Sequence, residues 1–182
     1  MEIADAALRI LSEQGVQRLT AVELARAVGI SDGAIFRHFR NKEEILAAAI
    51  DRYETLLFTG FPSEEPDPVQ RLRAFFLQRI RVLQEQPAIL HLAFTDRLSE
   101  AGSPAQQERL GTFVRRSLRF VMDCVVEAQE NQQLRADVHP QLLVWMVVGV
   151  LRGLATSPFP EWRTLAPEQA WQELWRMLRG QA

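Results

Sequence analysis

The sequence predicts an all-α protein of about nine helices. Apolar residues recur at intervals of three and four along most of the 182 residues, which is the period of a helix with one buried face. Residues that begin helices (Ser, Thr, Asp, Asn), and the glycines and prolines that end them, separate the periodic segments. The chain shows no β-hairpin signal, internal repeat or low-complexity tract. Its hydrophobic content of 47% and charged content of 24% are ordinary for a globular protein with a buried core.

Two short helices joined by a glycine turn are expected over residues 20–39. Thr20 begins the first helix, and Glu23 is placed to complete a reciprocal capping box with it. Gly29 ends this helix, because glycine adopts the left-handed conformation without steric cost. Ser31 is expected to cap the second helix. Two helices joined by such a turn form a helix-turn-helix, whose second helix can enter the major groove of DNA.

The second of these helices combines small residues with a cationic cluster. Gly33 and Ala34 would let the backbone approach base edges, and the densest positive run of the chain follows at residues 37–42. The net charge is −2, so binding to nucleic acid would depend on this local charge. A plain amphipathic hairpin in a helical bundle is the alternative, but it would not need small residues beside the cations. The candidate DNA-binding residues are Thr20, Ser31, Asp32, Gly33, Ala34, Phe36, Arg37, His38, Arg40 and Lys42.

The run ISDGAIFRHFRNKEEIL, residues 30–46, resembles the signature of the TetR family of transcriptional regulators. The preceding ALRILSEQGVQRLTAVELARAVG, residues 7–29, resembles the first two helices of that family, and the match covers about residues 3–52. The resemblance implies a helix-turn-helix DNA-binding domain at residues 1–58. It also implies a helical effector-binding and dimerisation domain at residues 59–182.

The chain departs from the family pattern at two positions of the signature. Phe36 stands where a tyrosine is common, so a phosphate contact through a hydroxyl is lost, and Arg37 replaces a frequent second aromatic residue. The sequence also starts almost directly on its first helix, without the basic arm through which the family usually contacts the minor groove.

The rest of the chain is expected to form further helices with recognisable starts. Asn41, Asp67 and Ser103 each stand before a periodic segment. The one clear change of composition is TGFPSEEPDP, residues 59–68, where the domain boundary is expected. The predicted helices cover residues 2–14, 20–28, 32–39, 42–59, 68–86, 88–100, 104–131, 139–156 and 167–179.

One stripe of the long helix at residues 104–131 mixes aromatic side chains with small polar ones. A ligand cavity needs apolar walls and a few orienting polar groups, whereas pure core seldom combines them. The alternative, ordinary core with Ser117 bonded to its own helix, stays open. The stripe lacks Arg and Lys, which favours a small, largely apolar effector. The candidate ligand-binding residues are Phe75, Phe94, Phe113, Ser117, Phe120, Cys124 and Trp145.

The last two predicted helices offer surfaces for a second chain. The run from Leu142 to Leu151 has no charged or polar side chain and is too short to span a bilayer, which needs about 20 residues. Burial on every side of such a helix indicates a partner, although packing within its own domain is the simpler alternative. The family resemblance favours a homodimer. The candidate interface residues are Gly149, Gly153, Trp171, Leu174, Trp175 and Leu178.

These features together predict a homodimeric, cytoplasmic transcriptional regulator, most simply a ligand-responsive repressor of a palindromic operator. The single cysteine, Cys124, excludes an intramolecular disulfide and fits a reducing compartment. The three histidines lack metal-ligand spacing, and no cofactor, membrane contact or enzymatic activity is expected. One alternative is a helical interaction protein that keeps the fold and contacts a protein partner. A small helical enzyme is the other, without an acid-base or metal constellation to support it.

Overall fold

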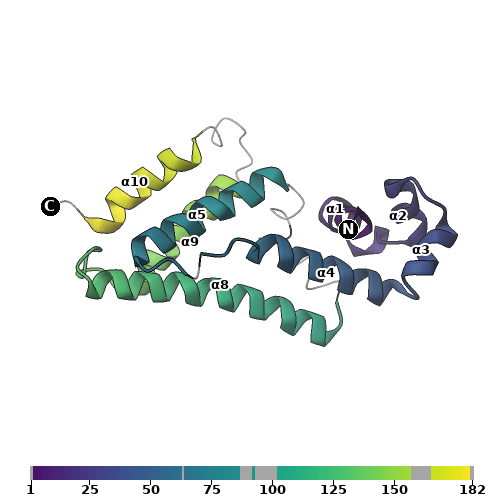
Figure 1. The fold of residues 1–182 in the computed structure, drawn as a ribbon, viewed down its shortest axis with the longest axis horizontal. Helices are drawn as coiled ribbons and strands as arrows, with labels where there is room; N and C mark the ends of the chain where they lie inside the picture. Colours follow the sequence, from purple (N-terminus) through teal and green to yellow (C-terminus); the bar gives the residue numbers. More distant parts are fainter. Residues whose placement is uncertain (1, 63, 87–91, 93–101, 157–164, 181–182) are drawn as a thin grey trace. The chain divides into compact units, whose positions relative to one another are not determined.

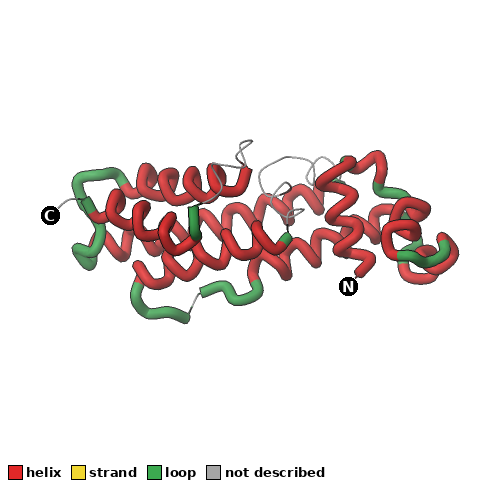
Figure 2. The backbone as a smooth tube through the Cα atoms, turned by 90° about the horizontal axis from the view of Figure 1, so that it is seen from above, coloured by secondary structure: helices red, strands yellow, loops and turns green. Residues whose placement is uncertain are grey.

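The computed structural model describes residues 2–62, 64–86, 92, 102–156 and 165–180. Every regular element in these residues is a helix, as Figures 1 and 2 show, so the predicted all-α fold is confirmed. Apart from Leu92, the predicted helix at residues 88–100 lies outside the described residues, and so does the candidate ligand-binding residue Phe94.

The internal contacts divide the chain into two compact units. The first unit comprises residues 1–59 and 86–113, and the second comprises residues 60–85 and 114–182. This grouping shares the boundary near residue 59 with the division expected from the sequence. It differs from that division by placing residues 86–113 with the N-terminal helices.

The first unit contains a bundle of short helices followed by a longer one. Leu8, Leu11, Leu24, Ile35 and Ile50 are fully buried and form its core. Helix α1 packs on α2 and α4, and α2 packs on α3. These elements are α1 (Glu2–Gln14), the 3-10 turn η1 (Val16–Arg18), α2 (Ala21–Val28), α3 (Asp32–His38) and α4 (Lys42–Phe58).

The start of α8 (Pro104–Glu130) completes the first unit by contacting α4. Arg109 bridges two carboxylates of α4, with its guanidinium nitrogens 2.5 Å from Asp51 Oδ1 and 2.5 Å from Glu54 Oε2. The ring of Phe113 lies against Tyr53 and Phe58, with centroid separations of 6.5 and 6.0 Å. The helix that follows the helix-turn-helix is therefore held by both charge and aromatic packing.

The second unit is built from α5 (Pro68–Glu85), the rest of α8, α9 (Pro140–Thr156) and α10 (Pro167–Arg179). Helix α5 packs on α9 and α10. The apolar core draws on all four helices and holds Phe76, Leu143 and Leu174 with at most 1% of each side chain exposed.

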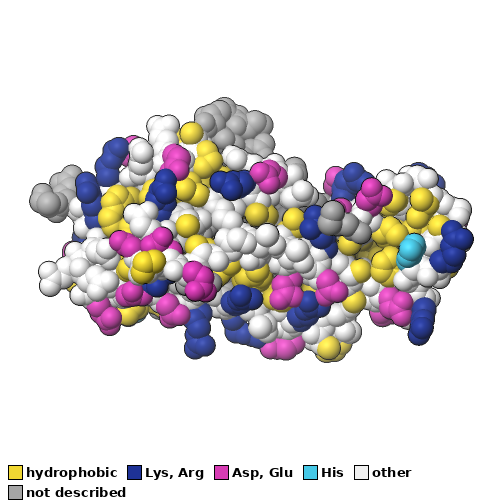
Figure 3. Space-filling model, in the orientation of Figure 1, with side chains coloured by type: hydrophobic (Ala, Val, Ile, Leu, Met, Phe, Trp, Pro, Cys, Tyr) yellow, Lys and Arg dark blue, Asp and Glu magenta, His cyan; other side chains and the backbone are white. Residues whose placement is uncertain are grey.

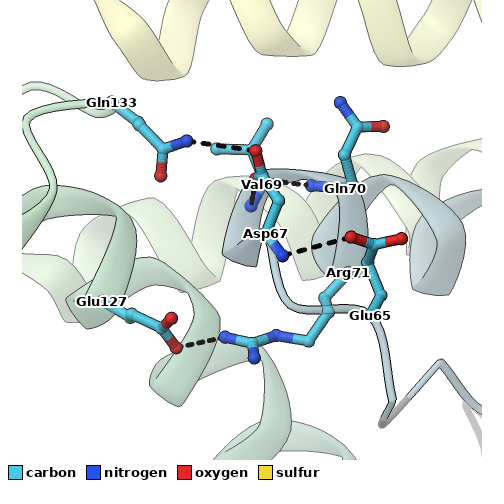
Figure 4. Close-up of polar contacts among 7 residues, drawn as sticks. All are labelled: Glu65, Asp67, Val69, Gln70, Arg71, Glu127 and Gln133. Carbon is cyan, nitrogen blue, oxygen red and sulfur yellow. Dashed lines mark hydrogen bonds and ion pairs between the residues drawn. The ribbon is translucent and has the colours of Figure 1, made fainter.

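The start of α5 is fixed by a polar network around Asp67 (Figure 4). Its Oδ1 accepts hydrogen bonds from the backbone N–H groups of Val69 and Gln70, at 2.8 and 3.2 Å, so the predicted cap is confirmed. Its Oδ2 accepts a hydrogen bond from Gln133 Nε2 at 3.3 Å. Arg71, one turn into α5, forms an ion pair with Glu127 of α8.

No helix in the described part of the chain combines the length and the apolar character that crossing a membrane requires.

Candidate nucleic-acid interface

The turn between α2 and α3 has the geometry of a glycine-terminated helix. Gly29 adopts the left-handed conformation, with φ +75° and ψ +33°, and its N–H donates to Ala25 O at 2.9 Å. The N–H of Ile30 donates to the same carbonyl at 3.0 Å. This double closure stops α2 and turns the chain into α3, as the sequence predicts.

The cap of α2 is only half of the predicted capping box. Thr20 Oγ1 accepts a hydrogen bond from the N–H of Glu23 at 3.2 Å. The second bond of the box, from the Thr20 N–H to the Glu23 carboxylate, does not form. The carboxylate accepts from Arg26 at 2.7 Å instead, and the Thr20 N–H donates to Arg18 O at 2.9 Å. The nearby arginine offers this carboxylate a charged donor, which is a stronger partner than a backbone amide.

Helix α3 turns one side into the core and the other to solvent. Ile35 is fully buried, and Ala34 is 9% exposed on the same side. The small side chain of Ala34, which was expected to help the backbone approach base edges, packs inward, next to Ile35 in the sequence. The residues of α3 on the outer side are Asp32, Gly33, Phe36, Arg37 and His38.

The outer side of α3 combines open space, an exposed ring and positive charge. A Cβ atom added to Gly33 would have no neighbour within 4 Å. Phe36 is 61% exposed, so most of its side chain faces solvent. The spacing of residues 32, 33, 36 and 37 places them on one face of the helix. A surface of this kind can approach a groove closely and still contact phosphates at its edge.

Ser31 occupies the N-cap position of α3 without the expected side-chain hydrogen bond. The first turn is closed instead by the Ser31 carbonyl, which accepts from the N–H of Ala34 at 2.9 Å. The prediction that its hydroxyl caps the helix is thus wrong. Ser31 itself is exposed beside the outer face of α3.

The start of α4 brings further cations to this surface. Asn41 Oδ1 accepts from the N–H of Glu44 at 2.9 Å, and Glu44 Oε2 accepts from the N–H of Arg40 at 2.8 Å. Lys42 Nζ donates to Val16 O at 2.6 Å, so this exposed lysine ties η1 to the start of α4. Arg40 and Lys42 are exposed, and Figure 3 shows basic and acidic side chains mixed over α2 and α3.

The candidate ligand-binding residues that the structure describes are divided between the two units. Phe75 and Phe120 pack together in the second unit, with centroids 5.5 Å apart, whereas Phe113 belongs to the first unit. Cys124 is buried, and burial raises the pKa of its thiol despite the nearby Arg71. Trp145 is 55% exposed on α9.

Two residues of this region were missed by the sequence reasoning. Phe61 contacts Phe75 and Phe120, at centroid distances of 5.7 and 4.5 Å. Arg79 Nη2 donates to Ser117 Oγ at 3.0 Å. The candidate stripe on α8 therefore contains no Arg or Lys of its own but contacts an arginine of α5. A signal was available, because Arg79 stands four residues after Phe75 on the buried stripe of α5.

The candidate interface residues separate into buried and exposed ones. Trp171, Leu174 and Leu178 are at most 4% exposed and belong to the core of their own unit, where Trp171 lies 5.6 Å from the ring of Phe76. Trp175 is half-buried and stacks on Trp171 at 6.1 Å. The simpler alternative, packing within the domain, therefore accounts for most of this stripe. The other two candidates, Gly149 and Gly153, are exposed, with open space where a Cβ would lie.

The all-helical fold and the two short helices joined at Gly29 define a protein with a helix-turn-helix segment. Residues 3–49 match the model of a family described as bacterial regulatory proteins, tetR family, so the helix-turn-helix segment of this chain is similar to that family.

Relatives and solved structures extend the likeness beyond this segment. The nucleoid occlusion factor SlmA of Marinomonas sp. (strain MWYL1) is 22% identical over 188 residues, covering 97% of this chain and 91% of that protein. The HTH-type transcriptional regulator TtgR of Pseudomonas putida is 25% identical over 156 residues, covering 84% of this chain and 66% of that protein. The crystal structure of AibR in complex with isovaleryl coenzyme A and operator DNA has a TM-score of 0.77. It is 19% identical and covers 97% of this chain and 96% of that one, which shows the shared fold.

Proposed function

We propose that the protein is a ligand-responsive transcriptional repressor that binds a near-palindromic operator as a homodimer in the cytoplasm. The observation that carries this proposal is the outer face of α3, where Gly33, Phe36 and Arg37 lie exposed together. A structural helix in so small a unit would gain stability from a larger residue at Gly33. A recognition helix gains close approach to the base edges instead.

The residues of this face have different roles in the proposed complex. Asp32 stands at the N-terminus of α3, where a carboxylate can accept a hydrogen bond from a cytosine amino group. Phe36 offers an apolar edge, which suits contact with a thymine methyl group. Arg37 and Arg40 are placed for phosphates at the groove edges, and Lys42 joins them by exchanging its bond to Val16 for a phosphate.

Dimerisation is proposed through the exposed face of α9. Leu142 and Trp145 are each 55% exposed, and Gly149 and Gly153 follow them at helical spacing. Large apolar side chains in one exposed row favour a covering surface, and glycines one turn apart permit close approach of a second helix. Two reading heads held about 34–36 Å apart, or a multiple of that, would supply the specificity that a single small head lacks.

The effector is proposed to bind the second unit and to act on the spacing of the two heads. The similar protein AibR is described in complex with both isovaleryl coenzyme A and operator DNA, so a chain of this fold can hold both. An effector that favours a different spacing binds in competition with the operator, and by linkage the operator weakens effector binding equally. We propose a largely apolar effector that contacts Phe75, Ser117 and Phe120.

A salt titration with matched arginine variants tests the DNA-binding surface. Arg37→Ala should lower affinity for duplex DNA and reduce the slope of log K against log salt by about one. Arg176→Ala is the control, because Arg176 is an exposed arginine of α10 that pairs with Glu173 at 2.9 Å. Equal effects of the two variants would contradict the assignment of α3 as the recognition helix.

A second candidate is a protein that keeps this fold and acts through a protein partner. The relative named nucleoid occlusion factor SlmA favours retaining it, since that name does not describe a transcriptional regulator. Salt-dependent binding to duplex DNA distinguishes the two functions. A repressor shows such binding and loses it when the effector is added, whereas a protein that acts only through a protein partner shows none.

A further inference from the structure

A hollow opens on the second unit between the segment that follows α8 and the last two turns of α10. It has a volume of about 850 Å³, and its lining residues come from positions 132–135 on one side and 173–180 on the other. The N–H of Arg135 donates to Leu178 O at 3.4 Å, which joins these two segments (Figure 1). The two walls of the hollow therefore belong to one packed unit.

Three arginines and a single glutamate line this hollow, which we call the arginine hollow. Arg135 donates to both carboxylate oxygens of Asp137, at 2.9 and 2.7 Å, and Arg176 lies 2.9 Å from Glu173. Arg179 is exposed and has no hydrogen bond or ion pair to any residue that the structure describes. It can therefore bind an acidic group without first releasing another.

Helix polarity explains only part of this arrangement. Arg176 and Arg179 lie in the last turn of α10, where positive charge complements the negative end of the helix. Arg135 belongs to no helix and lines the opposite wall. Met177, which also lines the hollow, is 50% exposed and has no charge to offer the helix end. The hollow thus combines positive charge from two segments with an exposed apolar side chain.

The composition of the lining favours a protein partner over other anions. Sites for small molecules are lined mostly by apolar side chains, whereas those of the arginine hollow are polar or charged apart from Met177 and Gly180. The phosphates of a nucleic acid would be repelled by the carboxylates of Glu173 and Asp137. Interfaces between proteins are enriched in arginine and methionine, and both are present here.

We propose that the arginine hollow binds an acidic peptide segment of a partner protein. A carboxylate of that segment pairs with Arg179, and an apolar side chain beside it covers Met177. Arg176 can exchange Glu173 for a second carboxylate of the segment, because an exposed ion pair is weak. The proposal goes beyond operator binding, since it gives the second unit a protein partner whose binding does not require α3.

Peptide selection on the full-length protein tests the proposal. The probe is a displayed library of random peptides, and the composition of the starting library is the reference. Bound peptides should be enriched in aspartate and glutamate with an apolar residue beside them. A pool that keeps the starting composition, or one that is enriched in basic residues, overturns the proposal.

Variants of Arg179 show whether the selected peptides bind in the arginine hollow. Arg179→Glu should weaken binding of a fluorescein-labelled selected peptide by about 10- to 100-fold in anisotropy titrations, because a charged hydrogen bond is lost. Arg179→Lys should keep part of the affinity, since it retains the charge without the planar fork. Arg119→Glu is the control and should bind the peptide as the wild type does, because Arg119 is an exposed arginine of α8 outside the hollow.

The apolar contact and the folding of the variants are measured separately. Met177→Gln should weaken binding of the same peptide, because it replaces the apolar side chain by a polar one of similar length. Circular dichroism should give these variants the melting temperature of the wild type, since Met177 and Arg179 are exposed. If Arg179→Glu melts at a lower temperature, Arg179→Gln makes the comparison without adding a negative charge, and its loss of affinity should be at least about 10-fold.

Other results would overturn the proposal by identifying a different site or occupant. Equal affinity of Arg179→Glu and Arg119→Glu for the peptide would mean that it binds elsewhere. If Arg179→Glu lowers the molecular mass of the free protein in light scattering and Arg119→Glu does not, the occupant is a second copy of the chain. Displacement of the peptide from the wild type by random-sequence duplex DNA, with weaker DNA binding in Arg179→Glu than in Arg119→Glu, would identify a nucleic-acid site.

Discussion

Replacing Gly33 separates the stability of α3, the proposed recognition helix, from its access to DNA. Gly33 lies in the first turn of α3, is exposed, and has open space where a Cβ would lie. Glycine in a helix is up to about 1 kcal/mol less favourable than alanine, so Gly33→Ala should keep or raise the melting temperature. Gly33→Leu should also fold, because its side chain extends into solvent.

The same substitutions should weaken DNA binding in order of size. A leucine side chain on the outer face of α3 would hold the backbone away from the base edges. Weaker hydrogen bonding to the bases should reduce the binding free energy by at least about 1.4 kcal/mol, which is a tenfold lower affinity, with a smaller effect for Gly33→Ala. Fluorescence anisotropy with a labelled operator measures the affinity, and circular dichroism measures the melting temperature. Gln84→Leu, at an exposed neutral position of α5, is the control.

Full affinity in Gly33→Leu would refute the reasoning, because it would mean that the start of α3 does not approach the bases. A loss of affinity that accompanies a fall in melting temperature would point to a folding defect instead.

Three further predictions address the phosphates, the bases and the assembly. Lys42→Ala should weaken binding to all DNA sequences alike and lower the salt slope by about one, as measured by anisotropy at several salt concentrations; a changed base preference would contradict this role. Asp32→Ala should relax preference at one position of each half-site, at about 1–3 kcal/mol of discrimination in a base-by-base binding profile. Unchanged preference with a lower melting temperature would reduce Asp32 to a helix-dipole role. Trp145→Glu should yield monomers in light scattering, since Trp145 is 55% exposed on the proposed dimer face, and a retained dimer would move the interface elsewhere.

Helix ends were predictable because their causes are local. Thr20, Asn41 and Asp67 each accept a hydrogen bond from the first turn of the following helix. Gly29 adopts the left-handed conformation that its position requires. Such bonds join residues two or three positions apart, so the sequence contains both partners and their spacing.

Side-chain partners are harder to predict wherever several donors or acceptors compete. The spacing of Glu23 predicts a hydrogen bond to Thr20, but its carboxylate pairs with Arg26 instead. Lys42, expected at a phosphate, donates a hydrogen bond to the backbone carbonyl of Val16. The helical period of α3 already places position 34 beside the buried Ile35, whereas the small size of Ala34 suggests the DNA face. The side of the helix on which a residue lies is predicted by the helical period and not by the size of its side chain.

Contacts between distant parts of the chain do not follow from local patterns. Arg79 meets Ser117 across 38 residues, and Phe61 packs on Phe120 from the segment assigned to a domain boundary. The tryptophan stripe of α10 suggests a surface in need of a second chain, although α5 of the same unit supplies the cover for Trp171. A stripe of apolar residues predicts burial but does not identify the covering surface.

Selection of bound sequences from a random pool of duplex DNA tests the central claim most directly. The account predicts enrichment of a near-palindrome whose half-sites lie one helical turn or a multiple apart, about 34–36 Å per turn. It also predicts that the protein bound to each DNA site is a dimer, with twice the 20.8 kDa mass of one chain. A pool that remains random after repeated selection, or an enriched site bound by a single chain, would contradict the account.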